Sequence, residues 1–407
     1  MKVLWFSLAP LTPVLRQGGY NGCGWISSLM SVFSRRIDVE LAVAFFCSSP
    51  GVKNIIGRVT YYPMRRPQSF VSKIDRFFRI SVQDRKELDL CKRVVEDFKP
   101  DIIQVFGTES SFGLIARETD IPVVIHLQGL MGPYLNAWIP PGYRMCDYAF
   151  RGSINPAQIA IGLRALAFNR HAAAREQVIM RSCKAFMGRT VWDRAFVSLT
   201  APQARYFECW EVLRSCFYEP GEWSPPSKPV FVSTISSPLY KGHDMILKIA
   251  RVLRNSGLYD FEWRVYGVQD FRFAERKTGI RAAGVGIRPM GVATAEQLRE
   301  ALLHASVYVH PSYVDNSPNS VCEAQILGVP IVATNVGGVG SLFSEDRADC
   351  LVPANDPTMA ACRIREALLD PDHFIADHSA CLARHDRTRI CENLIDIYRN
   401  LAETHRS

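Results

Sequence analysis

The sequence of 407 residues has no apolar run of about 18 residues, the length that a membrane-spanning helix requires. Its twelve cysteines are too sparse for a disulfide scaffold, and no two of them stand two to four residues apart. This spacing excludes a zinc knuckle and a redox CxxC motif, so we expect buried thiols in a reducing compartment. The first residues, Met1–Ser7, predict a buried strand and lack the long apolar core of a signal peptide. The expected location is cytoplasmic.

Charge of either sign is modest, with 48 Lys and Arg against 40 Asp and Glu, a net charge of +8. Nucleic-acid binders usually gather such charge with aromatic residues on one face. Only residues 64–79 do so here. This stretch predicts either a solvated loop and helix face or a surface for anionic lipid headgroups or a phosphorylated acceptor. We therefore expect no nucleic-acid partner and carry peripheral contact with the inner face of the cell membrane as a hypothesis.

Short apolar runs without period-2 alternation alternate with amphipathic segments, a pattern typical of parallel strands covered on both faces. The expected strands are Val3–Leu8, Val39–Phe46, Ile102–Phe106, Pro122–His126, Ala185–Gly188, Val230–Ile235, Trp263–Tyr266, Val307–His310, Ile331–Thr334 and Cys350–Val352. The expected helices are Gln83–Asp97, Phe112–Glu118, Asp244–Asn255, Ala295–His304, Met359–Leu369 and Arg387–Glu403. Strands that alternate with helices indicate repeated βαβ units.

The alternation breaks once, at Glu219–Pro229, where four prolines and one glycine fall within eleven residues. Such composition is typical of a linker. We therefore expect two α/β domains, residues 1–225 and 226–386, followed by a terminal helix at 387–407. Ligands of open parallel sheets bind beyond the carboxyl ends of the strands, so the site is expected between the two domains.

The segment from His310 to Pro330 begins at the carboxyl end of an expected strand. Ser317 is a favoured N-cap and Pro318 suits a first helical turn, while Gly328 ends the helix. A short helix over residues 318–327 is thus predicted to start in the cleft. The free backbone amides expected at its amino end are those near Asn319, Ser320 and Val321. Together with the helix dipole they predict an anion site.

Two carboxylates, Asp315 and Glu323, flank this predicted anion site. Such a pair is unfavourable if only phosphate binds, because like charges repel. It is favourable if each carboxylate accepts hydrogen bonds from hydroxyls on either side of a diphosphate, as a nucleotide sugar offers. The alternative interpretation is a turn residue and a surface helix residue.

Residues 310–338 resemble the signature of the retaining family 4 glycosyltransferases, which have the GT-B fold and carry two glutamates separated by seven residues. Asp315 and Glu323 have this spacing. The other matching positions are Pro311-Ser312, Pro318, Glu323-Ala324, Gly328, Pro330, Val332-Ala333-Thr334 and Gly337-Gly338. The departure is Asp315, one methylene shorter than the usual glutamate. Looser matches in the first half resemble the bacterial surface-polysaccharide subset of the family.

The resemblance implies two Rossmann-like parallel-sheet domains that face a central cleft, with the C-terminal helix crossing back to the N-terminal domain. The first domain would bind the acceptor and the second the nucleotide sugar. The implied activity is transfer of a hexose from a nucleotide-diphosphate sugar to a hydroxyl, with retention of configuration and no metal. Glu323 would hold the ribose and Asp315 the hexose. The implied partners are the nucleotide sugar and a glycan or lipid-linked acceptor.

Lys241-Gly242 follows the first strand of the second half and resembles the family's segment that neutralises the donor diphosphate. The family has an arginine where this chain has Ser236, so one cation is missing. Either another base supplies the charge or leaving-group stabilisation is weaker. A solvated turn lysine is the alternative. Gly267, at the end of the next strand, is a further donor-binding candidate.

The first half offers candidates at the ends of its strands. The glycine-rich loop after the first strand places Gly18 and Gly19 near the donor phosphates, and Tyr20 and Asn21 near the acceptor. By resemblance, His126 would lie near the hydroxymethyl group of the sugar. The remaining acceptor-side candidates are Glu109, Gln128 and Arg189, and a contact with the donor phosphate is the alternative role for Glu109 and Arg189.

Three alternatives remain open at this point. A nucleotide-sugar epimerase on the same scaffold would convert the donor without any acceptor. A catalytically inactive protein would bind nucleotide sugar yet release no nucleoside diphosphate, and Ser236 and Asp315 favour this hypothesis. A nucleic-acid binder is favoured by net charge alone, and a binding constant insensitive to salt would exclude it.

Overall fold

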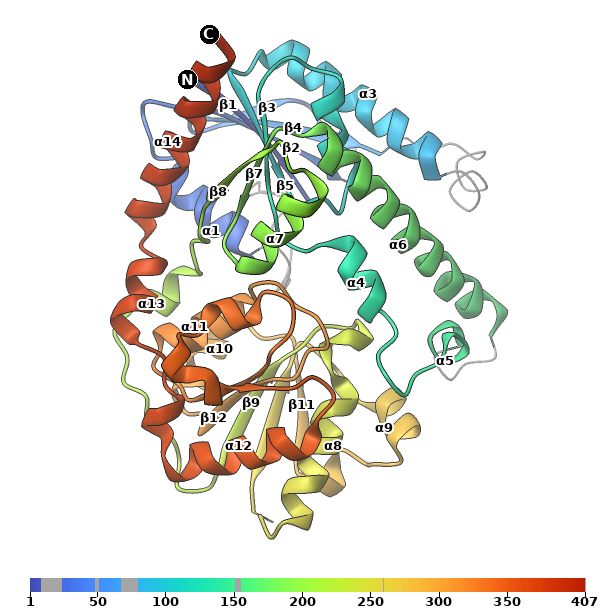
Figure 1. Ribbon diagram of the computed structural model, residues 1–407, viewed down its shortest axis with the longest axis vertical. Coiled ribbons are helices and arrows are strands. Elements are labelled where there is room, and N and C mark those ends of the chain that lie inside the picture. The colour runs from blue at the N-terminus through green and yellow to red at the C-terminus, as the bar shows by residue number, and fades with distance from the viewer. Residues whose placement is uncertain (9–23, 48–50, 67–79, 151–154, 259, 407) are drawn as a thin grey trace.

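The computed structural model describes residues 1–8, 24–47, 51–66, 80–150, 155–258 and 260–406. Two α/β halves lie one above the other, and the chain ends beside its own N-terminus (Figure 1). Each half is a sheet with helices packed around it, as the alternation of strands and helices predicts.

The first half contains an eight-stranded sheet in the order β3-β4-β2-β1-β5-β6-β7-β8. Its pairs are parallel apart from β3 with β4. The strands are β1 (Lys2–Ser7), β2 (Glu40–Cys47), β3 (Asn54–Ile56), β4 (Val59–Arg65), β5 (Ile102–Phe106), β6 (Val123–His126), β7 (Ala185–Gly188) and β8 (Arg205–Glu208). The five strands expected here are confirmed. The sequence pattern missed β3, β4 and β8 because they carry polar residues or proline and lie at or next to a sheet edge.

The second half contains a six-stranded sheet in the order β11-β10-β9-β12-β13-β14, and all of its pairs are parallel. The strands are β9 (Val230–Thr234), β10 (Glu262–Tyr266), β11 (Ile287–Gly291), β12 (Val307–His310), β13 (Ile331–Thr334) and β14 (Leu351–Val352). The edge strand β11 was not expected, since it exposes three of its five residues and contains Pro289.

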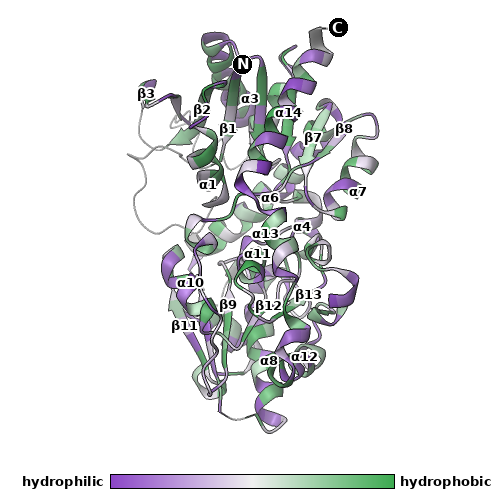
Figure 2. Cartoon of the chain, turned by 90° about the vertical axis from the view of Figure 1, so that its left-hand side faces the viewer, coloured by the Kyte–Doolittle hydropathy of each residue, from purple (hydrophilic) through white to green (hydrophobic). Residues whose placement is uncertain are grey.

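The helices cover both faces of the two sheets (Figure 1). Their bounds are α1 (Gly24–Phe33), α3 (Ile80–Phe98), α4 (Met131–Ala137), α5 (Met145–Phe150), α6 (Pro156–Ser182), α7 (Val191–Thr200), α8 (His243–Asn255), α9 (Arg272–Thr278), α10 (Ala295–Leu303), α11 (Asn319–Ile326), α12 (Pro357–Leu369), α13 (His378–Arg384) and α14 (Arg387–Arg406). The segment expected as a helix near residue 112 is a 3₁₀ helix, Ser111–Arg117. Figure 2 shows hydrophobic residues concentrated in the strands and hydrophilic ones on outward helix faces such as that of α10.

Helix α14 runs from the second half back to the first-half sheet and ends near the N-terminus (Figure 1). Its apolar stripe is buried in the core that α1 and the first-half strands form. Tyr398 on this stripe accepts a hydrogen bond from Trp5 Nε1 at 2.9 Å. The expectation that the C-terminal helix crosses back to the first half is confirmed.

The segment of α4 and α5 leaves the first-half sheet after β6 and packs against the second half. Tyr134 and Trp138 on this segment contact Tyr240, with ring centroids 5.2 and 5.4 Å apart. Lys277 of α9 pairs with Asp147 of α5 at 2.6 Å. The two halves therefore touch along the cleft as well as through the linker.

The strand order of each sheet reverses at a defined point. In the first sheet the neighbours of β1 are β2 and β5, and in the second the neighbours of β9 are β10 and β12. The loops that leave neighbouring strands there diverge and open a crevice at the carboxyl ends. Lys241 follows β9 and Asp315 follows β12, so both lie at the switch point of the second sheet.

Candidate active site

A cavity of about 480 Å³ lies between the two halves. The second half lines it with Tyr240, Lys241, Ser317 and Asn319. The first half lines it with Trp25, Glu109, Gln128, Gly129, Met131, Tyr134, Trp138, Arg189 and Glu211. Polar and aromatic side chains from both halves thus converge on one space that is large enough for a small-molecule ligand.

The short helix predicted at the cleft is α11, and its observed bounds differ by one residue at each end from those expected. The expected N-cap is wrong. Pro318 occupies that position, and its side chain has no atom that could accept a capping hydrogen bond. The Ser317 hydroxyl instead faces Cys322 Sγ at 4.0 Å. The amide of Val321 donates to Pro318 O at 2.9 Å. The amides of Asn319 and Ser320 remain at the open end of the helix, as its geometry requires.

Asp315 is buried within the loop between β12 and α11 and is not among the residues that line the cavity. Its carboxylate contacts Lys241 Nζ at 2.6 Å, His310 Nε2 at 3.1 Å and the Tyr134 hydroxyl at 3.3 Å. Burial by itself would raise the pKa of Asp315. The charge of Lys241 and the contact with His310 outweigh burial, and the pKa is lowered. Asp315 is therefore ionised and firmly held.

Glu323 is buried one turn inside α11 and faces the first half. Both of its oxygens accept hydrogen bonds from Arg214, at 2.7 and 2.6 Å. Burial raises the pKa of Glu323, while Arg214 opposes that rise. The carboxylate proposed for the ribose thus has an arginine partner that stacks on Phe217, with 4.9 Å from its guanidinium carbon to the ring centroid.

Lys241 reaches the cavity from the turn after β9, and this turn depends on Gly242. Gly242 has φ +83°, and a Cβ there would lie 2.2 Å from the carbonyl oxygen of Pro311. The glycine lets the two switch-point loops touch, which sets Lys241 against Asp315. Ser236 is exposed, and its carbonyl faces His243 Nε2 at 2.8 Å. Ser236 does not line the cavity.

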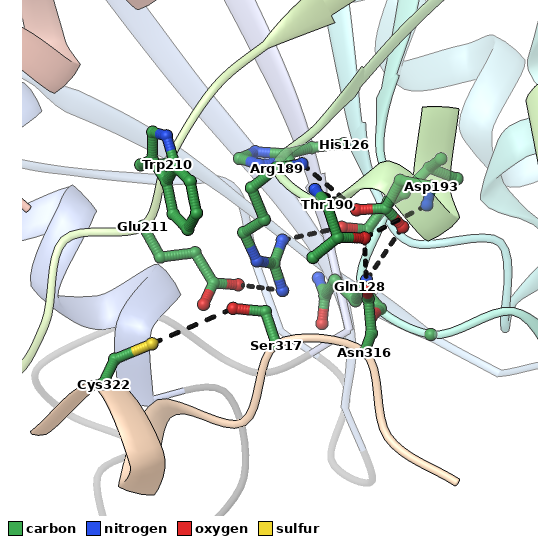
Figure 3. A network of polar contacts seen from close by, with 12 residues as sticks. His126, Gln128, Arg189, Thr190, Asp193, Trp210, Glu211, Asn316, Ser317 and Cys322 are labelled. Atoms are coloured by element: carbon green, nitrogen blue, oxygen red, sulfur yellow. Dashed lines mark hydrogen bonds and ion pairs between the residues drawn. The ribbon is translucent and has the colours of Figure 1, made fainter. Parts of the chain in front are cut away.

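Arg189 is the principal cation on the first-half side of the cavity and is 6% exposed. It pairs with Glu211 at 2.7 Å, donates to the Leu127 carbonyl at 2.9 Å and lies over Trp25. Figure 3 shows its guanidinium between Glu211 and Gln128, facing the loop that carries Ser317. Burial raises the pKa of Glu211 to about 7 despite the arginine.

Glu109 follows β5 at the switch point of the first sheet. Its Oε1 accepts a hydrogen bond from the Gly129 amide at 3.1 Å, while its buried Oε2 has no partner among the described residues. Burial raises its pKa to about 7. Gln128 Nε2 is likewise buried with no acceptor in the described part of the chain. Two of the acceptor-side candidates therefore keep unused polar atoms at the cavity.

His126 is buried and does not line the cavity. Its Nε2 lies 3.2 Å from the Cys209 carbonyl, and its ring packs edge-on against Trp25 with centroids 5.1 Å apart. Burial lowers its pKa to about 3, with a further contribution from Arg189, so the imidazole is neutral. His126 thus contacts Trp25, a residue of the cavity lining, without lining the cavity itself.

The residue after Asp315 joins the two halves. Asn316 is 1% exposed and bonds Thr190 Oγ1 at 2.9 Å, Asp193 Oδ1 at 2.9 Å and the Gln128 carbonyl at 2.8 Å (Figure 3). These bonds fix the loop between β12 and α11 relative to the ends of β6 and β7.

Some candidates lie elsewhere or outside the described residues. Gly267 follows β10 and donates to the Gly291 carbonyl at 2.7 Å. It does not line the cavity. The loop candidates Gly18, Gly19, Tyr20 and Asn21, and most of the basic stretch at 64–79, fall outside the described residues. Of that stretch, Arg66 pairs with Glu87 at 3.4 Å.

The sequence interpretation gave no site role to several residues of the cleft: Trp25, Tyr134, Glu211, Arg214 and Asn316. Trp25 and Tyr134 belong to helices whose packing partners lie far away in the sequence. Glu211 and Arg214 sit in the loop after an edge strand that was not predicted. Asn316 could have been proposed from the sequence, since it lies directly after Asp315.

The family described as "Glycosyl transferases group 1" matches residues 227–370, which include Lys241 and the whole loop from β12 to α11. The chain contains a group 1 glycosyl transferase domain. Two curated relatives of this domain are TuaC of Bacillus subtilis and the D-inositol 3-phosphate glycosyltransferase of Corynebacterium urealyticum. TuaC is 30% identical over 118 residues, 28% of this chain and 30% of TuaC. The second relative is 30% identical over 112 residues, 26% of each chain. The match therefore spans less than a third of either relative.

Solved structures extend the likeness to the whole chain. Sucrose-phosphate synthase from Thermosynechococcus elongatus has a TM-score of 0.74 at 14% identity and covers 99% of both chains. HepE of Anabaena, solved in complex with UDP-glucose, has a TM-score of 0.64 at 13% identity and covers 98% of this chain and 100% of that one. At such identities the likeness shows the fold alone. The fold is GT-B, as the group 1 domain and the two facing sheets indicate.

None of the helices in the described ranges combines the length and the hydropathy needed to cross a bilayer. The described residues also hold no group of three or more potential metal ligands.

Proposed function

We propose that the chain is a retaining glycosyltransferase that moves a hexose from a nucleotide-diphosphate sugar to a hydroxyl acceptor in polysaccharide or glycoconjugate biosynthesis. The observation that carries this proposal is the convergence of Lys241, the amino end of α11 and the acidic side chain of Glu109 on one interdomain cavity. Cations and free amides suit a diphosphate, and a carboxyl group suits sugar hydroxyls.

The diphosphate binds to Lys241 and to the amides of Asn319 and Ser320, which stabilise the negative charge that develops as it departs. Glu323 accepts hydrogen bonds from the ribose, and Asp315 accepts them from the hexose. The bond from the anomeric carbon to the phosphate oxygen breaks while the acceptor oxygen attacks from the same face. The departing phosphate takes the acceptor proton, and the configuration is retained because the acceptor attacks from the face that the phosphate leaves.

Glu109 and Gln128 bind the acceptor, a glycan or a lipid-linked glycan, on the first-half side. The relative TuaC, whose name places it in teichuronic acid biosynthesis, supports a cell-surface polysaccharide as product. We assign His126 a positioning role, since it holds Trp25 in the cavity wall.

A thermal-shift panel of nucleoside diphosphates and their sugar conjugates identifies the donor, because a bound ligand raises the melting temperature. With that donor, Lys241→Ala is expected to lower the rate of nucleoside diphosphate release about 100-fold. Lys228→Ala is the matched control, since Lys228 forms an exposed pair with Asp260 in the linker region. Equal rates in the two variants would show that Lys241 has no role in the site. A donor sugar epimerised without acceptor would favour the epimerase hypothesis instead.

A further inference from the structure

The second half supplies little net positive charge to the proposed diphosphate site. Lys241 is the cation that this half contributes to the cavity lining, and it is paired with Asp315 at 2.6 Å. Ser236, where the resemblance has an arginine, cannot donate a positive charge. A diphosphate carries at least two negative charges, so one paired lysine leaves it undercompensated.

The first half places a second cation opposite Lys241. Arg189 lines the same cavity as Lys241, Ser317 and Asn319. Figure 3 shows its guanidinium turned towards the loop at Ser317, just before the amino end of α11. The cation therefore lies across the cleft from the open amides of that helix.

Arg189 also has unused hydrogen-bonding capacity. A guanidinium has five N–H donors, and the side chain gives one bond to Glu211 and one to the Leu127 carbonyl. Its Nε is buried without an acceptor within the described residues, as is the neighbouring Gln128 Nε2. A buried donor usually has a partner in a folded protein, so the Nε of Arg189 beside this cavity favours an acceptor-rich ligand.

The surroundings of Arg189 hold it in place without cancelling its charge completely. Trp25 lies against the guanidinium, and Glu211 fixes one edge of it. The pKa of Glu211 is raised to about 7 by burial, so this carboxyl is partly protonated at neutral pH.

We propose that Arg189 is a donor-binding residue that contacts the diphosphate from the first half and supplies the cation that Ser236 does not. This inference rests on the proposed function and assigns Arg189 to the donor rather than to the acceptor. Full diphosphate binding then requires both halves, so cleft closure and leaving-group stabilisation depend on the same contact.

The test measures affinity for the nucleoside diphosphate that gives the largest shift in a panel of UDP, GDP and ADP, and for its monophosphate, by titration calorimetry. The double variant Arg189→Gln/Glu211→Gln removes the buried pair together, so that no uncompensated charge is left. We expect the preference for diphosphate over monophosphate to fall about 10-fold, the value of one charge-assisted hydrogen bond.

The controls separate the role of Arg189 from general damage. Glu211→Gln alone keeps the arginine and should keep the preference. Arg175→Gln/Asp84→Asn removes another buried pair of the first half, whose members do not line this cavity, and should also keep it. If the Arg189 double variant fails to fold, Arg189→Lys serves in its place and should keep part of the preference, because it retains the charge.

An unchanged preference in the Arg189 double variant, or an equal loss in the Arg175 control, overturns the inference while the proposed function stands. A full loss of preference in Arg189→Lys also overturns it, since a retained charge should retain part of the contact. If wild-type protein binds none of the three diphosphates, the proposed function fails and the inference fails with it.

Discussion

The second half builds its side of the cleft from one continuous stretch and one turn, whereas the first half gathers its side from scattered segments. Asp315, Ser317, Asn319 and Glu323 all fall between β12 and the end of α11. The first-half residues follow different strands: Glu109 after β5, Gln128 after β6, Arg189 after β7 and Glu211 after β8. A site built from one strand, one loop and one helix can be predicted from a local stretch of sequence. A cavity wall built from several loops depends on the order of the strands in the sheet, which no local stretch specifies.

The two sides also differ in how they hold charge. Asp315 faces a lysine and a histidine, and its pKa is lowered. Glu211 is buried and Glu109 is half-buried, both with less compensation, and the pKa of each is raised to about 7. The charge of Asp315 is thus fixed, while Glu109 and Glu211 on the first-half side change charge near neutral pH.

The largest expected effect concerns the ion pair that joins the two sides. Arg214→Ala leaves Glu323 buried with no cation and should lower the free energy of unfolding by about 3 kcal/mol. Chemical denaturation measures the loss. Arg272→Ala removes an exposed pair with Asp270 and should cause no measurable change. If both variants behaved alike, the Arg214–Glu323 bond would not exist in solution, and the two sides would be less coupled than the structure indicates.

The difference in charge predicts a difference in pH dependence. The folded pKa of Glu109, about 7, lies above its unfolded value near 4.3, so its contribution to stability is complete below the unfolded pKa and is lost as the pH rises through the folded pKa. Glu109→Gln cannot ionise, and its stability should fall less than that of the wild type between about pH 5 and pH 8, by about 2 kcal/mol. The measurement is denaturation at both pH values. The same change at the exposed Glu222 should leave the slope as in the wild type, and identical slopes for Glu109→Gln and the wild type would contradict the buried placement of Glu109.

The sequence predicted the fold well because most of its strands are short, apolar and unbroken, and because residues 310–338 match a long continuous family signature. It also predicted the position of α11 to within one residue at each end. The edge strands β8 and β11 escaped prediction because polar residues and a proline interrupt their apolar pattern. Because β8 was not predicted, Glu211 and Arg214, which follow it, were given no role in the site. Arg189 was found as a candidate, but its orientation across the cleft depends on Trp25 and Glu211, which are remote in sequence.

The smallest expected effect tests the wrong N-cap prediction at α11, in the second half. Because the Ser317 hydroxyl makes no cap hydrogen bond to α11, Ser317→Ala should cost less than about 0.5 kcal/mol. Thr294→Ala is the matched change at a true N-cap, since Thr294 and Gln297 form a reciprocal capping box at α10, and it should cost about 1 kcal/mol. Thermal or chemical denaturation of the two variants separates these values. If Ser317→Ala lowered the free energy of unfolding as much as Thr294→Ala does, the serine would cap α11 in solution. The N-cap predicted from the sequence would then be right, against the geometry of the loop.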